Sequence, residues 1–386
     1  LEVIPGKGEA ADSTVLISIV RDKVKLEDKS AQSKILEIEQ EGQTYKLGVI
    51  DIPAFYLDFE AYRNRDPDYK STTRDVSKLL IDLTEQQVDG IVLDLRNNGG
   101  GSLFEATALT DLFIDRGPVV QIRDSNQRIY RNQRATKPAL YNGPMLVMIN
   151  RLSASASEIF AGALQDYGRA LVVGSRSYGK GTVQDVTGLS SGQLKLTISK
   201  FYRVSGDSTQ HRGVLPDIAF PSAYDPEEVG ESHQDNALPW DQIRGVPHTN
   251  STELEGFILP LTKAHQRRSA ANPDYANLVD MLALTKSWDQ DQALSLNIEK
   301  RRERSAKWDT ELFSLENTRR SKKGLKPYID ITTWKEAEDP EKEDIAESDP
   351  LLQEAGYILT DQILLQARLK KTGQPQLAQV NKKSTK

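Results

Sequence analysis

Alternating apolar and polar positions dominate the first part of the chain and predict β-strands. A pair of strands is predicted over ILEIEQ (35–40) and YKLGVIDI (45–52), which the turn EGQT separates, and apolar positions alternate in TVLISIVRDKVKL (14–26). A period of two is typical of strands with one buried face. A further hairpin is predicted over residues 1–28, where EVIP, a Gly-Lys-Gly turn and TVLISIVRDKVKL follow one another.

Downstream of Asp66, strands alternate with helices. The segment STTRDVSKLLIDLTEQQV has a Ser/Thr cap followed by apolar residues at helical spacing. Three short apolar strands follow, GIVLDLR, PMLVMIN and ALVVG, and the first two lead through tight turns into the helices SLFEATALTDLFID and ASEIFAGALQDY. This repetition predicts an α/β core with mostly parallel strands.

The pattern changes again after Pro221. Residues 222–239 are acidic and rich in turn residues, which predicts a linker or an irregular crossing segment. From Ser251 onward the chain is predicted to be mainly helical, most clearly over 278–288, 297–321 and 349–370. The acidic run at 336–349 is predicted to be a solvated loop.

Length and charge narrow the class of protein. A chain of 386 residues is too long for one ordinary core, so we expect two or more domains. No apolar run approaches the roughly 20 residues of a membrane-spanning helix. A formal net charge of -6 argues against a nucleic-acid partner. Because the chain starts at Leu1 within an apparent strand, we expect further residues upstream.

Cysteine and histidine usage limits the possible chemistry. The chain has no cysteine, which excludes disulfides, thiolate metal sites and a cysteine nucleophile. Its four histidines show no metal-ligand spacing, and we expect each to be a surface residue: His211, His233, His248 and His265. We therefore predict no metal and no cofactor, and any serine chemistry has to proceed without a histidine base.

Three loops at the ends of successive strands carry the candidate chemistry, because ligands of open α/β sheets lie at the carboxyl ends of strands. The loop RNNGGG (96–101) can expose backbone amides to a phosphate or an oxyanion, although it also fits a plain tight turn. The loop SASASE (153–158) opens a helix, where a serine is either a cap or a nucleophile beside the helix dipole.

The third loop, GSRSYGKGT (174–182), almost matches a nucleotide-binding loop. Gly181 stands where that motif needs a hydroxyl, and the following TVQDV and LKLTISKFYRV predict strands where the motif needs a helix. The alternative is that Lys180 is a general base. Burial lowers the pKa of a lysine, and the flanking Gly179 and Gly181 leave room for the side chain to turn inward.

Together the three loops predict acyl transfer by a serine nucleophile, a lysine base and an oxyanion hole of backbone amides. The ordered motifs DLRNNGGG, NRLSASASEIFAGALQDYGRALVVG and SYGKGTVQ resemble those of carboxyl-terminal processing peptidases, specifically the bacterial tail-specific proteases. The resemblance implies a ClpP/crotonase-like βα superhelix core (31–223), a C-terminal remnant of a PDZ domain (1–30) and a mainly helical C-terminal domain (224–386).

The resemblance also implies roles for individual residues. Ser155 would be the nucleophile and Lys180, 25 positions later, the general base, with Gln184 positioning the lysine. Asp166 is expected among the catalytic and supporting residues. The amide of Ala156 with that of Gly100 or Gly101 would form the oxyanion hole, and Glu158 and Ser177 would support the site.

Two departures from the family pattern stand out. Gly99 replaces the proline of the usual Asn-Pro-Gly-Gly, and Ser177 stands where some members have threonine. Tail-specific proteases of Gram-negative bacteria lie in the periplasm, at the inner membrane, and act on proteins with nonpolar C-termini. The resemblance therefore implies a periplasmic endopeptidase whose partners are such substrates and an adaptor protein.

Two alternatives from other classes stay open. A crotonase-like enzyme acting on acyl-coenzyme A shares the fold and the backbone oxyanion hole, but it does not need the pairing of Ser155 with Lys180. A non-catalytic scaffold would bind partners through the PDZ remnant and the helical domain, and it has no use for a neutral lysine.

Overall fold

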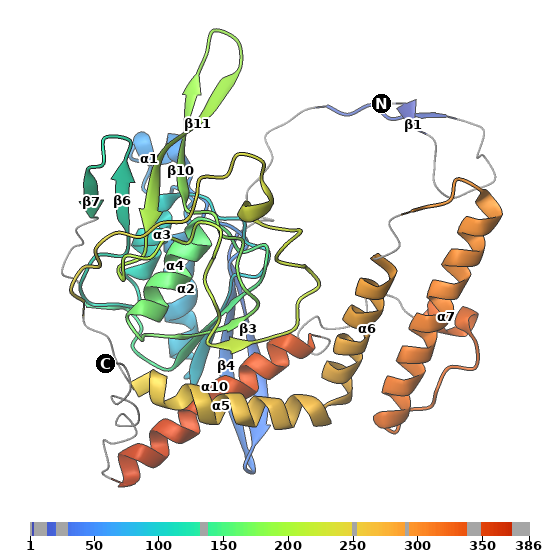
Figure 1. Ribbon diagram of the computed structural model, residues 1–386. Coiled ribbons are helices and arrows are strands. Elements are labelled where there is room, and N and C mark those ends of the chain that lie inside the picture. Colours follow the sequence, from blue (N-terminus) through green and yellow to red (C-terminus); the bar gives the residue numbers. More distant parts are fainter. Residues whose placement is uncertain are drawn as a thin grey trace, which may run out of the picture.

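A six-stranded sheet forms the centre of the molecule (Figure 1). The computed structural model describes residues 2–3, 14–20, 30–131, 138–248, 253–289, 293–337 and 349–372. The strands of this sheet are β3 (Gln32–Gln40), β4 (Gln43–Asp51), β5 (Gly90–Asp94), β8 (Met145–Ile149), β9 (Leu171–Gly174) and β12 (Ile218–Ala219). Their order is β12-β9-β8-β5-β4-β3, and every pairing is parallel except that of β3 with β4. The predicted, mostly parallel α/β core is confirmed.

Helices cover both faces of this sheet, which explains why its central strands are continuous apolar runs. One face packs against α2 (Thr72–Glu85), α3 (Leu103–Thr110) and α4 (Ala156–Asp166), and the other against α5 (Glu253–Ala271) and α10 (Pro350–Thr372). Successive side chains of a strand point to opposite faces. Accordingly, Ile91 and Leu93 join the first cluster and Val92 the second.

The helices of the first face begin where the sequence predicts. The side chain of Ser71 accepts a hydrogen bond from the amide of Arg74 and caps α2, and Ser102 caps α3 in the same way through Glu105. On the other face, Gly356 lets α10 approach β3 closely, because a Cβ atom there would lie 2.9 Å from side-chain atoms of Leu36 and Ile38.

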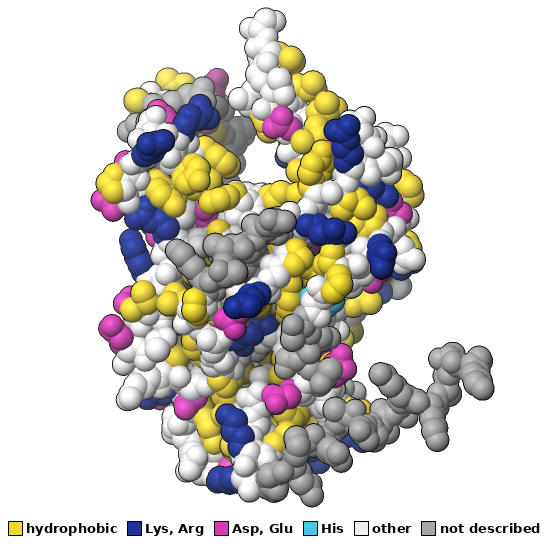
Figure 2. Space-filling view, turned by 90° about the vertical axis from the view of Figure 1, so that its left-hand side faces the viewer, with side chains coloured by type: hydrophobic (Ala, Val, Ile, Leu, Met, Phe, Trp, Pro, Cys, Tyr) yellow, Lys and Arg dark blue, Asp and Glu magenta, His cyan; other side chains and the backbone are white. Residues whose placement is uncertain are grey.

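A second, antiparallel sheet carries a projecting hairpin. Its strands are β6 (Gln121–Asp124), β7 (Ile129–Arg131), β10 (Thr182–Gly188) and β11 (Gln193–Tyr202), in the order β10-β11-β6-β7. The strands predicted after Lys180 are therefore confirmed, and the helix that a nucleotide-binding loop requires is not there. Figure 2 shows the β10–β11 hairpin rising above the rest of the molecule with hydrophobic side chains along it.

Helices α6, α7 and α8 form an arm beside the core (Figure 1). Their bounds are Pro273–Asp289 for α6, Ile298–Lys322 for α7 and Ile331–Ala337 for α8. The rings of Trp288 and Trp308 are in contact and join α6 to α7. The mainly helical C-terminal segment is confirmed. Two shorter helices, α1 (Phe59–Arg63) and the 3-10 turn η2 (Glu231–His233), lie in connecting segments.

One histidine prediction was wrong. His265 is buried between α5 and α10, where its Nδ1 lies 2.9 Å from a carboxylate oxygen of Glu354. Arg268, one turn further along α5, binds the same carboxylate at 2.7 Å. The packing of the two helices buries this polar cluster, and no local sequence pattern indicates such packing.

At the N-terminus only part of the predicted hairpin is described. Strand β1 (Glu2–Val3) pairs antiparallel with β2 (Val15–Leu16), as a hairpin requires, but β2 is shorter than predicted, because residues 17–20 are not in a strand. The Gly-Lys-Gly turn, residues 21–28 and residues 338–348 of the acidic run lie outside the described residues. The PDZ remnant stays a prediction.

Candidate active site

Ser155 occupies a strained turn between β8 and α4. Its φ of 56° and ψ of -110° lie where residues other than glycine are uncommon, a conformation that costs about 1–3 kcal/mol. The turn is held on both sides, since Ala154 N and Ser157 Oγ donate to the carbonyl of Asn98 at 2.9 and 2.8 Å. The serine thus lies at the N-terminus of α4, where the helix dipole favours negative charge.

The glycine-rich loop lies directly against this serine. A Cβ atom on Gly100, whose φ is +101°, would lie 2.9 Å from Ser155 Cβ and 3.1 Å from Ala156 N. Only glycine fits this approach. Asn98 organises the loop, because its buried side chain donates to Ile52 O at 2.7 Å and accepts from Gly100 N at 2.9 Å.

The backbone amides predicted to form the oxyanion hole differ in whether they already donate a hydrogen bond. The amide of Gly100 is committed to Asn98 Oδ1. Among the described residues, the amides of Gly101 and Ala156 have no hydrogen-bond acceptor, so these two are open to a developing negative charge. Gly99, which replaces the family's proline, faces open space, because an added Cβ would meet no atom within 4 Å.

Glu158 joins the serine turn to the lysine loop. Its carboxylate is fully buried and accepts four hydrogen bonds, from Ser155 N (2.8 Å), Ser177 Oγ (2.6 Å), Gly179 N (2.6 Å) and Lys180 N (2.9 Å). Burial raises the pKa of Glu158 to about 7, although the four hydrogen bonds act in the opposite direction. One carboxylate therefore fixes the spacing of both loops.

The amine of Lys180 is held by the residue predicted to position it. Lys180 Nζ donates to Gln184 Oε1 at 3.1 Å, and Gln184 Nε2 lies 3.4 Å from Thr197 Oγ1 on β11. Burial lowers the pKa of Lys180, and the charge of Lys195 lowers it further, while Glu231 and Glu158 act in the opposite direction. In the described part of the chain Lys180 Nζ makes no hydrogen bond to Ser155, so the amine rests on Gln184.

The two glycines beside Lys180 also make room for a neighbouring segment of the chain. A Cβ on Gly179, whose φ is +91°, would lie 2.8 Å from the carbonyl group of His211, and a Cβ on Gly181 would lie 2.7 Å from Gln210 N. The glycines therefore allow the segment 208–211 to pack against the lysine loop. This packing contributes to the partial burial of Lys180.

One supporting residue, Arg151, was not predicted from the sequence. Arg151, directly after β8, is 1% exposed, and its guanidinium donates to the carbonyls of Ser177, Val229 and Pro226. Of the two alternatives predicted for residues 222–239, the crossing segment is the one observed, because residues 234–238 line the site. The only signal for Arg151 was its place in the strand-to-helix turn before Ser155.

Both loops open onto one cavity of about 880 Å³. Gly99 and Ala154 line it from the serine side, Lys180 and Gln184 from the lysine side, and residues 234–238 from the crossing segment. This volume is within the range of ligand sites in enzymes.

Asp166 is not brought to this cavity. It ends α4, 11 residues after Ser155, which corresponds to about 16 Å along a helix. Its carboxylate binds the guanidinium of Arg203 at 2.6 Å. Asp166 therefore stabilises the far end of the helix and does not contact the serine or the lysine.

The described residues form neither a metal cluster nor a membrane-spanning helix. No group of three or more histidines, aspartates and glutamates there is arranged to hold a metal ion. The described helices also include none that is long and apolar enough to cross a membrane.

Comparison with protein families divides the chain into two matched parts. Residues 46–220 match peptidase family S41, and residues 224–364 match the C-terminal domain of tail-specific protease. The first part contains both loops of the candidate site, and the second begins at the crossing segment.

Individual relatives agree with this division. The chain is 38% identical over 376 residues to the tail-specific protease of Haemophilus influenzae, covering 94% of this chain and 50% of that protein. It is 42% identical over 154 residues to the carboxy-terminal-processing protease of Bartonella bacilliformis, covering 39% of this chain and 35% of that protein. The chain thus spans half or less of the length of these relatives.

Among solved structures, the photosystem II D1 C-terminal processing protease is 29% identical to this chain. The match covers 57% of this chain and 54% of that one, with a TM-score of 0.42.

Proposed function

Because the chain belongs to the tail-specific proteases of peptidase family S41, we propose that it is a serine endopeptidase in which Ser155 is the nucleophile and Lys180 the general base. The observation that carries this proposal is the Glu158 carboxylate, which binds the backbone of both residues and so couples the strained serine turn to the lysine loop. A lysine with a lowered pKa beside a serine at a helix N-terminus suits this chemistry.

The reaction follows from these groups. The neutral amine of Lys180 leaves Gln184 and takes the proton of Ser155 Oγ as this oxygen attacks the carbonyl carbon of the substrate. The amides of Gly101 and Ala156 stabilise the oxyanion, and the lysine ammonium then protonates the departing amine. In the second half, Lys180 takes a proton from water as this water attacks the acyl carbon, and the lysine ammonium returns the proton to Ser155 Oγ as the bond between this oxygen and the acyl carbon breaks.

We propose polypeptides with nonpolar C-termini as substrates and the periplasm, at the inner membrane, as the location. Both rest on the likeness to tail-specific proteases. An adaptor protein that delivers substrates is part of the same proposal. The crotonase-like and scaffold alternatives are not favoured, since the matched families and relatives are peptidases.

The test is cleavage of an unfolded protein with an apolar C-terminus, using the full-length protein that carries this chain. Ser155→Ala should reduce the rate by about 10⁴-fold or more, as for the loss of other serine nucleophiles. The matched control is Ser153→Ala, because Ser153 lies two positions away and its hydroxyl instead donates to Leu95 O. Equal losses in both variants, or loss of wild-type activity with a metal chelator, would contradict the proposal.

A further inference from the structure

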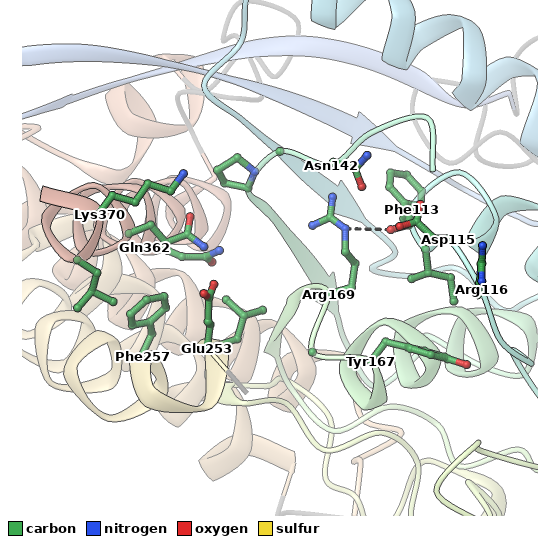
Figure 3. Close-up of a pocket in the computed structure, with 17 residues that line it drawn as sticks. Phe113, Asp115, Arg116, Asn142, Tyr167, Arg169, Glu253, Phe257, Gln362 and Lys370 are labelled. Atoms are coloured by element: carbon green, nitrogen blue, oxygen red, sulfur yellow. Dashed lines mark hydrogen bonds between the residues drawn. The ribbon is translucent and has the colours of Figure 1, made fainter. Parts of the chain in front are cut away.

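A second cavity lies between the protease core and the helices α5 and α10, away from the serine and the lysine (Figure 3). Its volume is about 910 Å³. Arg169 lines it from the turn that follows α4, at the opposite end of that helix from Ser155. Figure 3 shows Arg169 between the side chains of the core, such as Phe113 and Asn142, and those of the helices, such as Phe257 and Gln362.

Arg169 presents an open cationic edge to this cavity. Its Nε donates to Phe113 O and its Nη2 to Tyr141 O, both at 2.9 Å, and these two bonds fix the guanidinium in place. Within the described residues Arg169 has no salt bridge, and its Nη1 has no acceptor. Burial lowers the pKa of Arg169 to about 10, although Tyr141 and the carboxylate of Asp115, which forms no salt bridge with it, act in the opposite direction. A fixed guanidinium with a free edge is suited to bind a carboxylate.

Gln362 supplies the second polar group of the cavity. It comes from α10, its side chain is 2% exposed, and its Oε1 has no hydrogen-bond partner among the described residues. Buried acceptors in native proteins are nearly always paired, so an orphan acceptor on a cavity wall indicates a donor that a ligand provides.

The rest of the wall combines apolar side chains with the polar side chains of Asn142 and Gln366 and with charged groups of both signs. Phe257 and Leu254 of α5 are 1% and 7% exposed and line the cavity together with Phe113. At its rim are the exposed cations Arg116 and Lys370 and the acids Asp115 and Glu253, so the three cations, Arg169 included, exceed the two acids. The ligand should therefore combine an anion, a hydrogen-bond donor and an apolar group.

We propose that this cavity binds the C-terminal residue of a polypeptide. The terminal carboxylate binds the open edge of Arg169, the amide N–H of the same residue donates to Gln362 Oε1, and its apolar side chain packs on Phe257 and Leu254. This site lies at the other end of α4 from Ser155, so a tail bound here is not the segment being cleaved. Binding is independent of the proposed cleavage chemistry.

The test measures binding in the Ser155→Ala chain, so that failure of the proposed catalysis does not affect the result. The probes are N-acetyl-alanyl-leucine with a free carboxylate and the same compound as its C-terminal amide, titrated by calorimetry. The acid should bind about tenfold or more tightly than the amide, since only the acid forms the charged pair with Arg169. Equal affinities, or no binding of the acid, would overturn the proposal.

Two variants locate the binding. Arg169→Gln should abolish the preference for the acid. Gln362→Leu should weaken binding of the acid about fivefold or more, and it should not lower the midpoint of thermal unfolding, because it removes a buried orphan oxygen. Gln362→Leu keeps the proposal testable if Arg169→Gln does not fold. Unchanged affinity in Gln362→Leu would contradict the site.

A matched pair of lysines on α10 provides the control. Lys370 lines the cavity and Lys371 does not, and both are exposed. Lys370→Ala should weaken binding of the acid modestly at low salt, and Lys371→Ala should leave it unchanged. Equal effects of the two substitutions would mean that general surface charge attracts the probe, which contradicts a defined rim.

Discussion

Each end of helix α4 carries an acidic residue, and the two acids have different roles. At the N-terminal end, Ser155 is strained, and the buried carboxylate of Glu158 gathers hydrogen bonds from two loops beside a cavity. At the C-terminal end, Asp166 forms a salt bridge with Arg203, and the Tyr167 hydroxyl donates to Pro118 O. Strain and open amides thus gather at the end that faces the cavity, whereas the acid at the other end stabilises the fold.

The largest effect is expected from a substitution of Glu158, the acid at the N-terminal end of α4. Glu158→Gln replaces one carboxylate oxygen with an amide nitrogen, which cannot accept the two hydrogen bonds made to that oxygen. The serine turn and the lysine loop should then shift relative to each other, and kcat/KM should fall by about 10²-fold, the usual effect of a small misplacement.

Glu158→Asp provides the comparison for that variant, because it keeps the charge and shortens the side chain by one methylene group. It should retain more activity than Glu158→Gln when both are measured on the same peptide and both show native circular dichroism. Full activity of Glu158→Gln would mean that this carboxylate does not position the two loops.

The pH at which cleavage activity rises should shift in opposite directions in two further variants. Activity requires the neutral amine, so it rises with pH through the pKa of Lys180, which burial and Lys195 keep below its ordinary value. Lys195→Gln removes a lowering influence and should shift the rise to higher pH. Glu231→Gln removes a raising influence and should shift the rise to lower pH.

The measurement is kcat/KM against pH for wild type and both variants at low ionic strength, where charge effects are largest. Addition of salt should reduce both shifts. Shifts of the same sign, or no shift in either variant, would mean that Lys180 does not set the pH profile.

The smallest effect on activity is expected at the C-terminal end of α4. Asp166→Asn weakens the salt bridge with Arg203 and should lower the free energy of unfolding by about 2 kcal/mol. Because Asp166 touches neither loop, kcat should stay within about threefold of wild type. A large loss of kcat with unchanged stability would make Asp166 part of the catalytic machinery after all.

The sequence was most informative where the pattern is local. Strand and helix periods predicted β3 to β5, β8 and β9, and the helices between them, because side chains of one element share one buried face. The three loops of the candidate site were predicted for the same reason, since each directly follows a recognisable strand. Asp166 was nevertheless expected among the catalytic and supporting residues, and the structure places it at the far end of α4, where it binds Arg203.

Contacts between distant segments left no comparable signal. Arg151 binds carbonyls of residues 226 and 229, and Gly179 packs on His211, although each partner lies more than 30 positions away. The burial of His265 likewise depends on α10, whose Glu354 lies 89 positions further along the chain. Such pairs become visible only once the sheet and its covering helices are assembled.

The most direct test of the central claim is cleavage of an unfolded protein with an apolar C-terminus by Lys180→Ala in the full-length protein, with Lys195→Ala as the matched control. The account predicts loss of cleavage in Lys180→Ala at every pH with native circular dichroism, and retained cleavage in Lys195→Ala at a pH above its shifted rise. Undiminished cleavage by Lys180→Ala would show that this lysine is structural, and the proposed active site would be wrong.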